Sequence, residues 1–228
     1  MLRIVSYYTP THEEMCRRFV MARADGFHER RFSRFGQTCP TGVFYSPGWN
    51  DCMLDKLRCL LALPTDSMPT LYVDADVALM PGLHDWVAEY ARELGPDEVA
   101  FSDDLVQWCA GIMLFRSTTQ VREFWLTVAN MSQVWNLPDQ DVIAHMRMQC
   151  QQRNGKFPIT AKVLPAERFC NWATVNGKPV PPWSGEPFDV PETCLAWHAN
   201  WTVGMENKSR MLERVVMRET SQAAPLKA

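Results

Sequence analysis

The stretch Leu71-Tyr72-Val73-Asp74-Ala75-Asp76-Val77-Ala78-Leu79-Met80 is the most informative part of this 228-residue chain. Its apolar run predicts a buried strand that ends at two acids one residue apart. In an extended chain, residues i and i+2 point to the same face, with Cα atoms about 6.6 Å apart. Because a buried carboxylate is costly unless it is paired or holds a cation, Asp74 and Asp76 predict a divalent-cation site. The alternative is that both acids only end the strand and cap a turn.

Strand and helix patterns alternate on both sides of this stretch, which predicts an α/β fold built on a layered sheet. The expected strands cover residues 2–8, 27–35, 69–73, 99–102, 109–115 and 193–198. The expected helices cover residues 11–24, 50–63, 84–94, 117–131, 138–153 and 205–219. Thr11 and Glu14 predict a capping box at the start of the first helix. Pro138 is expected at the first position of its helix.

Length and the absence of a linker predict a single domain over residues 1–228. Residues 1–155 are expected to form its core, and residues 156–200, which are rich in Pro, Trp and Gly, an irregular cap. A C-terminal helical segment over residues 201–219 follows. The last eight residues, 221–228, are expected to fray.

Charge and composition narrow the classes of function. The formal net charge is −3, which does not fit the basic surface of a nucleic-acid-binding domain. The first 35 residues hold seven Arg against four acids, an excess that a solvated helix face explains. No apolar run approaches the roughly 20 residues of a membrane span, and the N-terminus does not resemble a signal peptide. Eight Cys without a C-x-x-C pair predict reduced thiols in a cytoplasmic protein.

Three further segments carry polar groups that suit a shared site. Asp139-Gln140-Asp141 lies in the first turn of a predicted helix, where capping is the alternative role. His198 leaves a strand and is followed by Gly204 and Lys208 at the mouth of a helix, where backbone N–H groups and a cation favour phosphate. Gly111 enters a buried strand, where a missing side chain lets a ligand approach.

Taken in order, these motifs resemble the GT-A glycosyltransferases. They are a strand ending in Asp74-x-Asp76, the Ala110-Gly111 strand, Asp139-Gln140-Asp141, and the ending formed by His198, Gly204 and Lys208. From Ile4 to Met211, the chain is similar to the nucleotide-diphospho-sugar transferases related to plant xylosyltransferases and to the retaining galactosyltransferase/glycogenin group.

The C-terminal motif formed by His198, Gly204 and Lys208 departs from the pattern of one of these two groups. The retaining galactosyltransferase group has His-x-x-Gly-x-x-Lys-Pro-Trp, whereas here Gly204 comes six positions after His198 and Ser209 replaces the Pro. The longer spacing fits the plant-xylosyltransferase-like branch.

The resemblance implies a fold and an activity. The fold is GT-A, a Rossmann-like mixed central sheet flanked by helices. The activity is metal-dependent transfer of a sugar from a nucleotide-diphospho-sugar, expected to be a UDP-sugar, with retention. Mn²⁺ or Mg²⁺ is expected on Asp74, Asp76 and His198, and mixed carboxylate and imidazole ligation suits manganese better. Residues 1–155 would bind the nucleotide-sugar, and residues 156–200 would form the acceptor side.

The resemblance also implies roles for further residues. Contacts with the nucleotide and its phosphates are expected from Tyr7, Tyr8, Thr9, Lys56, Ala75, Gly204 and Lys208. Contacts with the sugar are expected from Asp103, Asp104, Ala110 and Gly111. Asp139, Gln140 and Asp141 are the catalytic candidates, with Gln140 and Asp141 facing an oxocarbenium-like sugar. Trp172 and Trp183 are candidate acceptor platforms, and core packing is their alternative role.

Two other classes of function fit part of the pattern. A haloacid-dehalogenase-like phosphohydrolase would use Asp74 as its nucleophile. That motif continues with Ser or Thr, where this chain has Ala78, and it sits on the first strand. A non-catalytic nucleotide-sugar-binding module would keep the fold without turnover. For the transferase, the expected acceptor is a glycan, a protein or a modified base in DNA.

Overall fold

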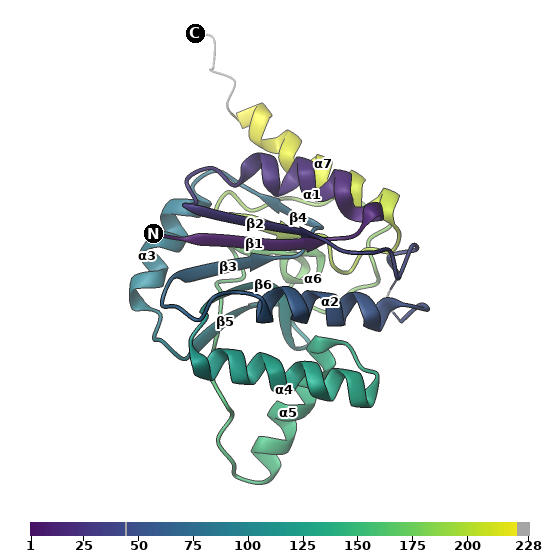
Figure 1. The fold of residues 1–228 in the computed structure, drawn as a ribbon. Coiled ribbons are helices and arrows are strands. Elements are labelled where there is room, and N and C mark those ends of the chain that lie inside the picture. The colour runs from purple at the N-terminus through teal and green to yellow at the C-terminus, as the bar shows by residue number, and fades with distance from the viewer. Residues whose placement is uncertain (44, 223–228) are drawn as a thin grey trace.

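The computed structural model describes residues 1–43 and 45–222, and it has the predicted α/β architecture (Figure 1). The strands are β1 Arg3–Tyr8, β2 Glu29–Arg34, β3 Pro69–Val73, β4 Val77–Leu79, β5 Glu98–Asp103, β6 Trp108–Arg116, β7 Thr160–Val163, β8 Phe169–Cys170 and β9 Ala196–His198. The helices are η1 Pro10–His12, α1 Glu13–Phe19, η2 Met21–Arg23, α2 Trp49–Leu61, α3 Leu83–Glu93, α4 Thr119–Trp135, α5 Asp139–Gln152, α6 Trp172–Asn176 and α7 Met205–Gln222.

The main sheet has the strand order β2-β1-β3-β6-β5-β7. Strand β1 pairs in parallel with β2 and β3, whereas β6 is antiparallel to β3 and β5. This sheet confirms the predicted mixed central sheet of an α/β fold. Because β1 and β3 are parallel neighbours, their carboxyl ends open at the same edge, which is where open α/β sheets bind ligands.

Helices cover both faces of this sheet, as Figure 1 shows. Side chains alternate between the faces along each strand. Val5 and Tyr7 of β1 therefore belong to an apolar cluster with α2, α4 and α5. Ile4 belongs to the cluster on the opposite face, with α1, α3 and the smaller sheet. The layers place β1 and β3 between two apolar cores, with the strand ends at the sheet edge.

A second sheet has the strand order β4-β9-β8 and was not predicted from the sequence. The apolar run 71–80 is divided: β3 ends at Val73, residues 74–76 cross over, and β4 begins at Val77 in the other sheet. Antiparallel pairing of β4 and β9 places Val77 opposite His198. The crossover therefore brings the two acids next to a histidine that follows more than 120 residues later in the sequence.

The first predicted helix differs from the structure. It is broken into η1, α1 and η2, and the expected capping box does not form between the described residues Thr11 and Glu14. Glu14 pairs instead with Arg17 at 2.6 Å. Pro138 is the N-cap of α5 and not its first helical residue. The last helix continues to Gln222, and the expected fraying of residues 223–228 lies outside the described residues.

Six N-terminal arginines pair with acids. Arg3 is buried and lies 2.6 Å from Asp66 and 2.8 Å from Glu29. The exposed pairs join Arg17 to Glu14, Arg18 to Glu213, Arg30 to Asp25, Arg31 to Glu29 and Arg34 to Glu13. These acids balance the charge of the arginines with which they pair.

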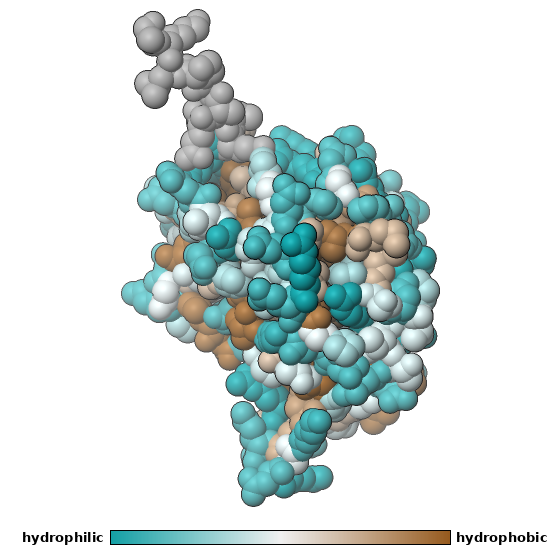
Figure 2. All heavy atoms as spheres, turned by 90° about the vertical axis from the view of Figure 1, so that its left-hand side faces the viewer, coloured by the Kyte–Doolittle hydropathy of each residue, from teal (hydrophilic) through white to brown (hydrophobic). Residues whose placement is uncertain are grey.

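The cysteines, the helices and the surface bear on the expectations drawn from composition. All eight cysteines lie in the described ranges and are free. None of the described helices has the length and apolar character needed to cross a membrane. Figure 2 shows the face of the molecule that includes α3; it is mostly hydrophilic, and its apolar atoms form separate patches.

Candidate active site

A cleft of about 390 Å³ lies at the sheet edge where β1, β3 and β9 end. Residues from both ends of the sequence converge on it, because the parallel strands and the β4–β9 pairing open at the same place. The predicted site residues that line it are Tyr7, Tyr8, Thr9, Lys56, Asp74, Ala75, Asp76, Asp104, Asp139, Gln140, Asp141, His198 and Lys208.

Other predicted residues lie beside the cleft and do not line it. The Asp103 carboxylate accepts a backbone N–H two residues further on, at 2.9 Å, and so shapes a turn. The Ala110 N–H donates to Gln140 Oε1 at 3.3 Å. The Gly204 carbonyl accepts the N–H of Lys208 at the start of α7. These residues support neighbours that do line the cleft.

The structure places Trp172 and Trp183 in an apolar core and not in the cleft. Both are more than nine-tenths buried and pack edge-on against Phe188. Their indole N–H groups donate to the carbonyls of Pro181 and Glu186. Core packing, the alternative role, is therefore the role that the structure shows for both rings.

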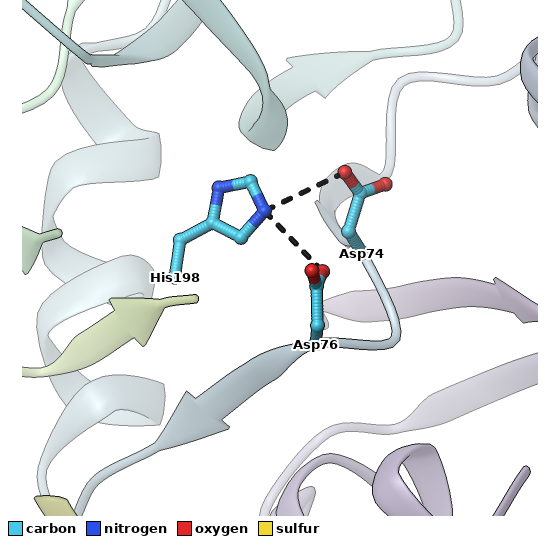
Figure 3. Close-up of side chains that lie close together, drawn as sticks. All are labelled: Asp74, Asp76 and His198. Atoms are coloured by element: carbon cyan, nitrogen blue, oxygen red, sulfur yellow. Dashed lines mark ion pairs between the residues drawn. The ribbon is translucent and has the colours of Figure 1, made fainter. Parts of the chain in front are cut away.

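Asp74, Asp76 and His198 form a compact cluster in the cleft (Figure 3). One ligand atom from each lies within 4.8 Å of the others. His198 Nε2 lies 3.3 Å from Asp76 Oδ1 and 3.8 Å from Asp74 Oδ2, and Figure 3 shows this nitrogen facing both carboxylates. Two carboxylates and one imidazole form a donor set that fits a divalent transition-metal cation.

The backbone and one glycine hold this cluster together. The Asp74 N–H donates to the Gly111 carbonyl at 2.8 Å, and the Ala199 N–H donates to the Asp76 carbonyl at 2.9 Å. A Cβ at Gly111 would lie 2.1 Å from His198 Cε1 and 2.9 Å from Asp74 Oδ2. Only a residue without a side chain leaves room for the imidazole at this point.

Two buried lysines flank the acids. Lys208 Nζ lies 2.6 Å from Asp76 Oδ2, so α7 is tied to the crossover. Lys56 Nζ lies 2.9 Å from Asp139 Oδ2 and 3.5 Å from Asp74 Oδ1. Because both ammonium groups are almost fully buried, each needs a carboxylate partner to offset its desolvation. The result is a cleft floor with alternating positive and negative charge.

Burial and charge shift the protonation of the cluster in different directions. Burial raises the pKa of Asp74, although Lys56 and His198 oppose the shift. Burial also acts to raise the pKa of Asp76, but Lys208 and His198 outweigh it and hold that pKa well below its usual range. Burial lowers the pKa of His198, whereas the Cys109 sulfur and the Asp76 carboxylate raise it to about 10. A coordinating imidazole must be neutral, so cation binding would release this proton.

The other end of the cleft is built on α5. Gln140 Nε2 donates to Asp104 Oδ2 at 2.8 Å, while Gln140 Oε1 accepts the Ala110 N–H. Both ends of the amide are thus fixed, and its orientation follows from these partners. The Tyr45 hydroxyl donates to Asp141 Oδ2 at 2.8 Å and joins the loop before α2 to this helix.

The cleft also contains residues that the sequence analysis missed, among them His12, Asn200 and Trp201. Asn200 Oδ1 is buried without a hydrogen-bond partner in the described part of the chain. An unpaired buried oxygen costs free energy, which a ligand donor would recover. Burial lowers the pKa of His12 to about 4, so this ring is neutral at pH 7. Asn200 and Trp201 follow His198 by two and three positions, and this proximity in the sequence could have indicated that they lie in the site.

The amino-acid sequence matches the model of a known protein family. Residues 20–212 match the model of the nucleotide-diphospho-sugar transferases. The chain belongs to this family. The match confirms the resemblance that the motifs predicted, and it identifies the chain as a glycosyltransferase. The phosphohydrolase alternative required its acids on the first strand, whereas those of the transferase follow β3.

Solved structures show the same fold at low sequence identity. A glycosyltransferase involved in the glycosylation of the major capsid of PBCV-1 has 11% identity and a TM-score of 0.59, covering 93% of this chain and 98% of its own. The galactosyltransferase LgtC, in complex with donor and acceptor sugar analogues, has 11% identity and a TM-score of 0.56, covering 99% and 98%. Mouse xyloside xylosyltransferase 1 has 9% identity and a TM-score of 0.51, covering 87% and 97%. No curated protein sequence matches the transferase.

Lys56→Met is expected to lower the free energy of unfolding of the transferase by about 3–5 kcal/mol, because it leaves the carboxylates of Asp139 and Asp74 without their shared cation. Urea unfolding followed by circular dichroism measures the change. Lys156→Met, at an exposed lysine, is the control and should shift the stability by less than about 0.5 kcal/mol. Equal stabilities for both variants would contradict the buried ion-pair account.

Proposed function

We propose that the transferase moves a sugar from a UDP-sugar to an acceptor with retention, in the presence of Mn²⁺. The convergence of Asp74, Asp76 and His198 in one cleft is the observation that carries the proposal. Manganese is preferred to magnesium because imidazole nitrogen is a poor ligand for the harder ion. Retention and the uridine nucleotide rest on the resemblance to the retaining galactosyltransferase and plant-xylosyltransferase groups.

The donor would lie along the floor of the cleft. Tyr7, Tyr8 and Thr9, at the end of β1, would contact the base and ribose, as this crevice position suits a nucleotide. The backbone at Ala75 and Gly204 would approach the phosphates. A divalent cation on Asp74, Asp76 and His198 would act as a Lewis acid and stabilise the charge on the departing nucleoside diphosphate.

Charge on the chain itself would assist departure of the leaving group. Lys208 places a buried ammonium next to Asp76, where the phosphates would carry new negative charge. A fixed cation at such a position stabilises the transition state without reorganisation. Lys56 holds Asp139 and Asp74 in place and keeps the local charge close to balance.

The sugar would lie at the α5 end of the cleft. Gln140 is held by Asp104 and Ala110, so its amide is fixed before the donor binds. We assign Gln140 and Asp141 to the face of the oxocarbenium-like sugar, where an oxygen would stabilise positive charge. Asp139 is buried against Lys56 and would position this first turn of the helix. Asp103, Asp104, Ala110 and Gly111 would complete or support the sugar pocket.

The acceptor side is proposed to include residues 156–200, next to a nucleotide-sugar-binding core over residues 1–155. In the described structure, residues 156–200 add β7 to the main sheet and β8 and β9 to the second sheet. Trp201 and Trp49 line the cleft and offer aromatic surface for a sugar, a role that Trp172 and Trp183 are too buried to fill.

A panel of nucleotide sugars tests the proposal, with release of nucleoside diphosphate as the readout in Mn²⁺, in Mg²⁺ and in EDTA. We expect one donor class to be hydrolysed slowly in Mn²⁺, more slowly in Mg²⁺ and not in EDTA. Binding of a donor without any release would support the non-catalytic module. Phosphate release from an aryl phosphate would support the phosphohydrolase. Metal-independent hydrolysis would overturn the assignment of the cation site.

A further inference from the structure

A second hollow, which we call the α5 groove, opens beside the active-site cleft. It has a volume of about 210 Å³ and lies between one face of α5 and the turn that joins β5 to β6. Its lining residues are Val106, Gln107, Trp108, Gln140, Ile143, Ala144, Arg147, Met148 and Gln151. The α5 residues are spaced by three and four positions, so they form a single stripe along the helix.

The groove is continuous with the cleft. Val106, Gln107 and Gln140 line both hollows. From Gln140 to Gln151 the stripe extends for about 16 Å at 1.5 Å per residue. A molecule with one end next to Gln140 can therefore lie along α5, outside the space that the donor would occupy.

Arg147 is the charged residue among those that line the groove. The Arg147 guanidinium lies 4.3 Å from the centroid of the Trp108 ring, and the Phe101 ring lies nearly parallel to Trp108 at 5.5 Å. This stacking orients the guanidinium while leaving its N–H groups free to donate. Among the residues that the structure describes, Arg147 makes no ion pair, and no acid lines the groove. An oxyanion is the ligand group that complements such a site.

The neutral groups of the groove suit a glycan. Gln107, Gln140 and Gln151 contribute carboxamides, which both donate and accept hydrogen bonds. Hydroxyl groups have the same double capacity, so a row of amides suits a chain of sugars. Carboxamides beside one guanidinium therefore match an oligosaccharide that carries an acidic group.

We propose that the α5 groove extends the acceptor side beyond residues 156–200, and that the acceptor it binds is an acidic oligosaccharide. The accepting sugar would lie next to Gln140, and a carboxylate or phosphate on a neighbouring sugar would contact Arg147. The two Cα atoms are seven residues apart, or about 10 Å along the helix, so the anion belongs to a second unit of the chain. The inference rests on the proposed transferase function and adds the class of acceptor.

Matched oligosaccharides test this assignment by binding. The probes are a tetragalacturonide and a hyaluronan tetrasaccharide, each paired with the same compound after reduction of its carboxylates to alcohols. A phosphorylated maltotetraose and its dephosphorylated form distinguish phosphate from carboxylate. Binding is followed by protein-observed NMR with Mn²⁺ replaced by diamagnetic Mg²⁺ and with UDP present. We expect at least one acidic probe to bind about tenfold more tightly than its neutral partner.

Arginine variants locate the effect. Arg147→Gln should remove the preference for the acidic probe, and Arg147→Lys should retain part of it, because lysine keeps the charge and loses the planar fork. Arg153→Gln, an exposed arginine near the end of the same helix and outside the groove, should leave the preference unchanged. Circular dichroism checks that each variant is folded.

Every other outcome counts against the inference. It is overturned if no acidic probe binds with a Kd below about 10 mM, a value that a few charge-assisted hydrogen bonds should reach. It is also overturned if the neutral partners bind equally well, or if the preference for the acidic probe survives in Arg147→Gln. Tighter binding of an acidic tetrapeptide than of any glycan would contradict the glycan assignment. Donor hydrolysis without an acceptor separates a failure of the transferase function from a failure of the acceptor assignment. If the donor is hydrolysed but no acidic probe binds, only the acceptor assignment is wrong. If the donor is not hydrolysed, the proposed function itself is wrong.

Discussion

Asp76→Asn is expected to reduce metal-dependent donor hydrolysis by about a thousandfold or more, comparable to the loss of a preorganised charge-stabilising group. Asp76 contributes an oxygen to the predicted cation site and also pairs with Lys208 at 2.6 Å. The amide removes the charge that both partners need. The measurement is the rate of nucleoside diphosphate release at saturating Mn²⁺, together with the Mn²⁺ concentration that gives half the maximal rate.

The fold should survive this change. The pairing of β4 with β9 depends on backbone groups, including the Asp76 carbonyl that accepts the Ala199 N–H. Circular dichroism of the variant should therefore match the wild type. Asp85→Asn removes a carboxylate that is 91% exposed in α3 and should retain full activity. If Asp76→Asn keeps more than a tenth of the wild-type rate, the acid is not part of the catalytic site.

Gly111→Ala is expected to lower the rate of donor hydrolysis by about a hundredfold and to weaken Mn²⁺ binding. The new Cβ would lie 2.1 Å from His198 Cε1 and 2.9 Å from Asp74 Oδ2, distances that force the ring or the strand to move. Displacements of about 1 Å at a catalytic centre have effects of this size. Titration of Mn²⁺ by electron paramagnetic resonance measures the loss of affinity directly.

Gly36→Ala is the matched control for this substitution. A Cβ at Gly36 meets no atom within 4 Å, so the same chemical change should leave both rate and Mn²⁺ affinity unaltered. A Gly111→Ala protein with wild-type Mn²⁺ affinity would show that His198 does not need its position against this strand. The cation site would then lie elsewhere in the cleft.

Local patterns predicted most of the elements but not the way in which they cross. The alternation of strands and helices follows from short-range periodicity, and the observed bounds lie within a few residues of those expected for α3 and α5. The division of residues 71–80 between two sheets depends on long-range pairing with residues 196–198. No periodicity within a single segment contains that information.

The site, too, depends on contacts between segments that are far apart in the sequence. Asp74, Asp76 and His198 were expected together because of a resemblance in motif order, and the structure brings them within 4.8 Å. The capping box at Thr11 failed because Pro10 begins a short 3-10 helix, which moves the start of α1 to Glu13. The burial of Trp172 and Trp183 depends on tertiary packing against Phe188, which composition alone does not reveal.

A crystal of the transferase grown with Mn²⁺ and UDP, with diffraction recorded at the manganese absorption edge, locates the cation directly. We expect an anomalous peak between the carboxylates of Asp74 and Asp76 and Nε2 of His198, with diphosphate oxygens completing the coordination. An empty cleft, or a manganese ion bound away from these three side chains while UDP is present, would contradict it.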